Sequence, residues 1–110
     1  MGYRDEITSL VEEAMQLVRR ACSREELRGV CESLEDVLMA VLDAAGEPER
    51  ILPTSAPILE HASEELRRAA LKAAREGLEE ESRLLEDASR RLTAAAEAAS
   101  ELLHRLLTSG

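Results

Sequence analysis

The sequence predicts an all-α fold, a helical or coiled-coil-like bundle of three or four antiparallel helices in a single domain over residues 1–110. Leu and Ala, with 18 and 17 copies, dominate the apolar content, and both favour helix. Residues that favour strands are scarce, because the chain has one Tyr and neither Phe nor Trp. Along most of the chain, apolar residues recur every three or four positions, which is the period of an amphipathic helix.

The first helix is expected at about 4–22. Its apolar residues fall on one stripe when they are placed at 100° per position. They are Ile7, Leu10, Val11, Ala14, Leu17, Val18 and Ala21.

A second helix is expected at about 24–45, because the apolar residues that follow form a stripe in a shifted phase. The shift places a turn at Cys22–Ser23, and a sharp kink in one long helix is the alternative. Ser23 and Glu26 have the spacing of a capping box, and Gly46 is a typical C-terminal stop. The stripe comprises Leu27, Val30, Cys31, Leu34, Val37, Leu38, Val41 and Ala45.

Residues 46–57, GEPERILPTSAP, hold all three prolines and are expected to be a connector without regular helix. Ile51 and Leu52 are expected to cover the open end of the bundle. Thr54 or Ser55 can cap the next helix, with Pro57 in its first turn.

The remainder predicts helices at about 58–76 and 79–107, or one continuous helix over both ranges. Gly77 is the only helix breaker, and the apolar stripe is interrupted only at 79–83. The stripe contains Leu59, Ala62, Leu66, Ala69, Ala70 and Ala73 before the interruption, and Leu84, Leu85, Ala88, Leu92, Ala95, Ala99, Leu102, Leu103 and Leu106 after it.

The acids Glu79–Glu81 allow three interpretations. Gly77 can end one helix, with Leu78 as the accompanying apolar contact, so that the acids form the first turn of the next. The helix can instead continue with the acids in water, or the carboxylates can form a metal or arginine site. In a strict heptad that begins with Leu71, Ala74 and Leu78 and continues through Leu85, Glu81 takes a core position, so we expect that it is not buried alone.

Acid–base pairs four residues apart are typical of solvated helix. One of them spans the acidic stretch and favours the continuous helix. The pairs are Glu64–Arg68, Glu79–Arg83, Glu86–Arg90, Asp87–Arg91 and Glu101–Arg105.

Glu101 and His104 have the Glu-x-x-His spacing of helical di-iron sites. Such a site needs a second copy of the motif, which the chain lacks, and both His61 and His104 fall far from the apolar stripe. No metal or cofactor is therefore expected. A metal or carboxylate site at Glu79–Glu81 or at Glu101 and His104 remains the alternative.

Cys22 and Cys31 have neither zinc-site spacing nor neighbouring ligands. If a helix begins right after the turn, Cys22 lies beside residues 24–27, and a disulfide to Cys31 would be strained. We therefore expect two buried thiols, which suits a reducing, cytoplasmic location.

The net charge of −9 comes without a basic segment, so nucleic acid is not an expected partner. No apolar run is long enough for a signal peptide or a membrane span. Because the chain lacks a glycine-rich phosphate loop and pocket-lining aromatic rings, we do not expect an enzyme.

The expected function is non-enzymatic: helical protein–protein interaction or self-assembly through a Leu/Ala seam. The expected partner is another copy of the chain or a helical protein. The candidate surface consists of Leu78, Glu81, Leu85, Leu92, Ala95, Ala99, Leu102 and Leu106.

Helices on either side of a mid-chain connector give the chain a plan that resembles the WXG100 type of secreted helical hairpin. That resemblance implies a secreted helical protein as a further alternative. The Trp-x-Gly turn of that type is absent, because the connector holds no Trp. No Tyr-x-x-x-Asp/Glu signal follows the second half, since Tyr3 is the only tyrosine.

Overall fold

The computed structural model describes residues 3–23, 25–45 and 48–109. This part of the chain contains helices α1 (Tyr3–Ala21), α2 (Arg28–Ala45), α3 (Pro48–Arg75) and α4 (Glu79–Ser109), with a short 3₁₀ helix η1 (Glu25–Leu27) before α2. It contains no strand. The prediction of an all-α helical bundle is confirmed.

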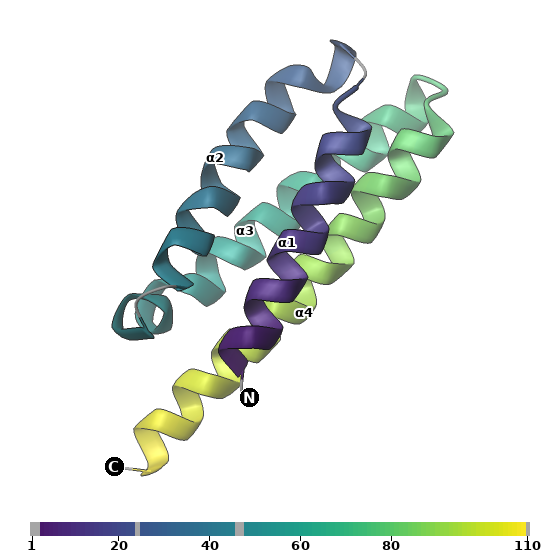
Figure 1. Cartoon of the computed structure of the whole chain (residues 1–110). Helices are drawn as coiled ribbons and strands as arrows, with labels where there is room; N and C mark the ends of the chain where they lie inside the picture. Colours follow the sequence, from purple (N-terminus) through teal and green to yellow (C-terminus); the bar gives the residue numbers. More distant parts are fainter. Residues whose placement is uncertain (1–2, 24, 46–47, 110) are drawn as a thin grey trace.

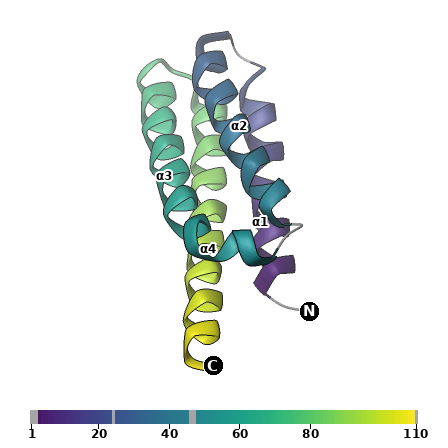
Figure 2. The same ribbon diagram turned by 90° about the vertical axis from the view of Figure 1, so that its left-hand side faces the viewer.

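The four helices lie side by side along one long axis (Figures 1 and 2). α4 packs most extensively, against α3 and then against α1, while α2 packs on α1 and α3. The C-terminal end of α4 continues beyond the ends of the other helices in both views. The molecule measures 51 × 20 × 19 Å along its principal axes.

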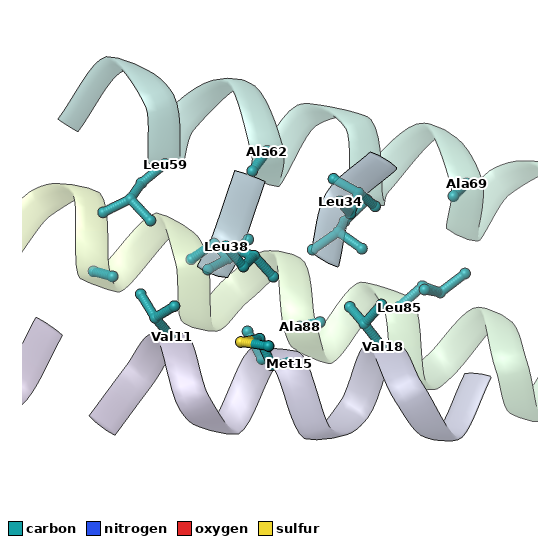
Figure 3. Packing of buried hydrophobic residues seen from close by; sticks show 14 of the residues in the cluster. Val11, Met15, Val18, Leu34, Leu38, Leu59, Ala62, Ala69, Leu85 and Ala88 are labelled. Atoms are coloured by element: carbon teal, nitrogen blue, oxygen red, sulfur yellow. The ribbon is translucent and has the colours of Figure 1, made fainter. Parts of the chain in front are cut away.

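The predicted stripes of all four helices meet in one core (Figure 3). Every predicted stripe residue of 58–76 is buried, as are five of those predicted in the first helix. The largest side chains with almost no exposure are Ile7, Leu27, Leu38, Leu59, Leu66, Leu85, Leu92, Val11 and Val18. The 3.6-residue period therefore identified the buried face of each helix correctly.

The prediction of two free thiols is wrong, because Cys22 and Cys31 form a disulfide with their Cα atoms 6.0 Å apart. That separation is ordinary for a disulfide. The error came from starting the second helix at residue 24. Residues 25–27 form η1, and Cys31 is therefore only the fourth residue of α2, close to the turn and to the end of α1.

The predicted capping box of Ser23 and Glu26 is described only at Ser23. The Ser23 hydroxyl donates a hydrogen bond to the Arg20 carbonyl oxygen at 3.1 Å, and so it caps the end of α1. The side chain of Glu26 and the proposed stop at Gly46 lie outside the described residues. The predicted turn at Cys22–Ser23 is confirmed, and a single kinked helix is excluded.

The prediction of a non-helical connector at 46–57 is wrong, because α3 begins at Pro48 and includes Pro53 and Pro57. Pro48 occupies the first helical position, where a missing N–H costs nothing. Figure 2 shows the first turns of α3 crossing the molecule near the end of α2, with α1 and α4 continuing past them, before the helix turns to run along α4. Pro53 and Pro57, four residues apart, share one face of the helix, where each removes a hydrogen bond and favours a bend.

Thr54 and Ser55 therefore lie inside α3 and do not cap it. The side chains of Ile51 and Leu52 lie outside the described residues, so their predicted position over the bundle end is not described.

The helix break at Gly77 is confirmed, and the continuous helix over 58–107 is wrong. Gly77 has φ +82°, which is the left-handed region. The Leu78 N–H donates to the Ala73 carbonyl at 2.8 Å, and the Gly77 N–H donates to the Ala74 carbonyl at 3.1 Å. This pair of bonds is the Schellman motif, and Leu78 supplies its apolar contact with the core.

Candidate interaction surface

Most of the predicted surface on α4 is buried inside the chain. The exposed fractions of Leu85, Leu92 and Ala95 are 0%, and that of Ala99 is 1%. These residues belong to the core between α4 and the two helices that it packs against most extensively, α3 and α1. Within the folded chain, this section of the Leu/Ala seam is an internal contact.

The ends of the predicted surface are more open. Leu78, before α4, and Leu102, near its end, are both half-buried against the core. Leu103 is half-buried as well, and Leu107 is 75% exposed. The side chain of Leu106 lies outside the described residues. Apolar residues thus continue along α4 toward its projecting C-terminal end, which Figure 1 shows past the other helices.

Glu81 is 9% exposed in the first turn of α4, while Glu79 and Glu80 are exposed. The three acids form the first turn of a helix, as the first interpretation predicts. Carboxylates at this end interact favourably with the helix dipole. Leu71 and Ala74, which the predicted heptad places in the core, are exposed. Glu81 is therefore buried as part of the first turn of α4, and not as a member of a heptad that runs through both helices.

Ion pairs on the helix surfaces follow the sequence spacing only in part. Arg90 pairs with Glu86 at 2.9 Å, Arg91 with Asp87 at 3.7 Å, and Arg105 with Glu101 at 3.3 Å. The predicted Glu64–Arg68 pair is wrong, because Arg68 pairs with Glu65 at 3.2 Å instead. Within the described residues no ion pair joins Glu79 to Arg83, so the pair that favoured a continuous helix does not form.

A cluster of hydroxyl groups between α3 and α4 was not predicted. Ser63 Oγ lies 2.9 Å from both the carbonyl oxygen and the Oγ of Ser89, and 2.7 Å from Thr93 Oγ1. The Ser89 hydroxyl donates to the Ser63 carbonyl at 2.9 Å. The spacing of Ser82, Ser89 and Ala96 at seven residues on α4 was the available signal, since small residues repeated on one face let helices approach closely.

Two larger grooves lie on the surface. One, of about 450 Å³, runs between α2 and α3 and is lined by Gly29, Ser33, Leu34, Val37, His61, Ala62 and Glu65. The other, of about 280 Å³, runs along α3 and α4 and is lined by Arg67, Ala70, Leu71, Ser82, Glu86, Ser89 and Arg90. Neither includes the predicted metal or carboxylate residues.

Glu101 and His104 are both exposed on the projecting end of α4. The Arg105 side chain donates a hydrogen bond to the Glu101 carboxylate at 3.3 Å. The His104 carbonyl accepts a hydrogen bond from the Thr108 hydroxyl at 3.0 Å. Among the residues that the structure describes, no three His, Cys, Asp or Glu side chains gather as metal ligands would.

None of the described helices contains an apolar stretch long enough to cross a bilayer. No family model matches the chain, and no curated protein or solved structure is significantly similar to it.

Proposed function

We propose that this chain is a non-enzymatic helical module that binds a second copy of itself or another helical protein through the projecting end of α4. The proposal keeps the predicted Leu/Ala seam but relocates the contact. The buried section around Leu85 and Leu92 holds the monomer together, and the section after Leu102 is left for a partner.

One observation carries the proposal. α4 has 31 residues, so at about 1.5 Å per residue it is roughly 46 Å long. Its last turns extend past the other helices, and the apolar stripe does not end with the core, because Leu103 is half-buried and Leu107 is 75% exposed. A helix that presents such a stripe commonly packs against another helix.

The test is solution mass as a function of concentration, measured by sedimentation equilibrium. Leu103→Glu with Leu107→Glu is expected to weaken self-association at least about tenfold, because two charges enter an apolar contact. The matched control is Leu71→Glu, which changes a 57% exposed leucine on α3. Equal weakening by both variants would place the contact elsewhere, and a wild-type monomer at every concentration would exclude self-assembly.

Adding EDTA to the same experiment distinguishes the helical contact from the alternative, a metal site at Glu101 and His104. A metal held between copies predicts that the assembly dissociates in EDTA and that Glu101→Gln does the same. The helical-contact proposal predicts an assembly that EDTA leaves intact.

The location that we propose differs from the cytoplasmic one that the sequence suggests. The Cys22–Cys31 bond favours an oxidising compartment, since disulfides are rare in proteins that remain in a reducing cytosol. Thiol titration of the chain isolated without reductant from its native source tests this expectation. Free thiols there would return the proposal to a reducing location.

A further inference from the structure

We propose that the Cys22–Cys31 disulfide is a redox-sensitive latch for α2. With the bond intact, α2 is held on the bundle. When a dithiol reduces the bond, α2 loosens, while α1, α3 and α4 stay packed. This device is separate from the projecting end of α4 and does not depend on the function proposed for that surface.

α2 is the helix least built into the core. The extensive helix pairs are those of α4 with α3 and with α1, whereas α2 packs less extensively on α1 and α3. Figure 3 shows Leu34 and Leu38 of α2 placed over the layer between α3 and α1. The three other helices therefore retain their main contacts with one another if α2 moves.

Both edges of α2 are bordered by open space. The groove of about 450 Å³ lies on its α3 side, and a second groove of about 190 Å³, lined by Glu12, Met15, Gln16, Arg19 and Met39, lies on its α1 side. Gly29, in the first turn of α2, has no atom within 4 Å of the place that a Cβ would occupy.

The ion pair that the structure describes between α2 and another helix is exposed and weak. In the described part of the chain, the ion pair that joins α2 to α1 is Arg19–Glu35 at 3.3 Å, and the Arg19 side chain is 59% exposed. An exposed pair of this kind adds little. By contrast, buried hydroxyl bonds fasten α3 to α4 through Ser63 and Ser89.

The disulfide is placed where it controls the start of α2. Cys22 is half-buried just after α1, and Cys31 is 3% exposed on the first turn of α2, with its Sγ 4.0 Å from the Val18 carbonyl oxygen of α1. The bond thus joins the end of α1 to the first turn of α2. Because Cys22 is the more exposed partner, it is the sulfur that a reductant reaches first.

The redox step exchanges one disulfide for another. A thiolate of the dithiol attacks the sulfur of Cys22, the bond between the cysteines breaks, and Cys31 leaves as a thiolate that takes up a proton. The second thiol of the dithiol then displaces Cys22, which also ends as a thiol. Two electrons pass from the dithiol to the protein, and the two sulfurs, no longer bonded, must separate to van der Waals contact.

Hydrogen exchange followed by mass spectrometry tests the latch on the whole chain, with and without dithiothreitol. Peptides from α2 are expected to exchange at least about tenfold faster in the reduced chain, while those from the α3–α4 interface remain unchanged. Thiol titration of both samples verifies that the bond is closed in one and open in the other.

Cys22→Ala with Cys31→Ala is the matched variant, since Ala fits the small apolar sites without the bond. It is expected to show the fast exchange of α2 whether or not dithiothreitol is present. Equal protection of α2 in the oxidised and reduced wild type would overturn the latch. A loss of protection shared by all helices would also overturn it, because the bond would then support the whole fold. If the variant fails to fold, the wild-type comparison decides by itself.

Discussion

At the scale of single residues, the hydroxyl cluster between α3 and α4 is the feature that fixes how these helices meet. The Ser63 and Ser89 hydroxyls can each donate to the carbonyl of the other residue, and Thr93 Oγ1 lies within reach of both Ser63 Oγ and the Ser89 carbonyl. Every hydroxyl proton then has an acceptor, and among the described buried side chains no polar atom lacks a hydrogen-bond partner. Such a satisfied network favours one register of the helix pair.

Ser63→Ala is expected to lower the free energy of unfolding by about 1–2 kcal/mol, because it removes a buried hydrogen bond. Urea denaturation measures the change. The control is Ser100→Ala, an exposed position on α4, which should change stability by less than about 0.5 kcal/mol. A double-mutant cycle of Ser63→Ala with Ser89→Ala should be non-additive, and strict additivity would contradict a shared network.

At the scale of elements, Gly77 decides that the second half of the chain is two helices. Its backbone conformation turns the chain so that α4 runs back along α3, and the two bonds of the Schellman motif satisfy the carbonyls that end α3. The same turn makes Glu79–Glu81 the first turn of a helix, where their charge is favourable. Three acids in a row are thus a helix start and not an interruption.

Gly77→Ala should lower the free energy of unfolding by about 1 kcal/mol, because only glycine adopts a positive φ without strain. No atom lies within 4 Å of the added Cβ, so the cost is conformational and not steric. Gly29→Ala, at a helical glycine with equal free space, should instead raise stability by up to about 1 kcal/mol. Equal effects of both substitutions in urea denaturation would argue against the left-handed turn.

Pro53 and Pro57 lie inside α3, at positions where the sequence predicted no helix. Proline disfavours the interior of a straight helix, but a helix at the end of a bundle can bend. α3 bends where it turns from crossing near the end of α2 to running along α4. Pro53 and Pro57 lie within the first ten residues of α3, so the hydrogen bonds that they remove are lost near its N-terminal end.

At the scale of the whole molecule, one core of Leu and Ala holds helices of mixed surface charge together. Ala at the helix contacts lets α3, α4 and α1 approach closely, and Leu fills the space between them. Apart from Glu81, the charged side chains that the structure describes are exposed or half-buried, and ion pairs such as Arg91–Glu13 at 3.1 Å connect α4 to α1. Stability is expected to rest on apolar packing, since exposed ion pairs contribute little.

A buried and an exposed leucine of α3 test whether stability rests on apolar packing in the core. Leu66→Ala should lower the free energy of unfolding by about 2–5 kcal/mol, because Leu66 is 0% exposed and its removal leaves a cavity in the core. Leu71→Ala, at a position 57% exposed, should change it by less than about 0.5 kcal/mol. Similar losses from the two variants would mean that Leu71 is covered in solution, as an interface at that groove would require.

The sequence by itself determined the fold class, the position of α1 and the buried face of each helix, and it left open whether residues 58–107 form one helix or two. These depend on local propensity and on a 3.6-residue period, both of which act within one segment of chain. The heptad drawn through Leu71 and Glu81 failed because it assumed that the phase continues past residue 77. One glycine with positive φ ended that continuity.

Only the tertiary structure decided the rest. Whether two cysteines bond depends on where a turn brings their backbones, and η1 brought Cys31 close to Cys22. Whether a leucine on the seam contacts the chain itself or remains open depends on the lengths of its neighbours. Leu85 and Leu92 are fully buried in the core, whereas Leu107 is 75% exposed near the C-terminal end of α4, the end that continues past the other helices in Figure 1. A stripe in the sequence states that a face is apolar, and the packing of the other helices determines how much of that face is left to a partner.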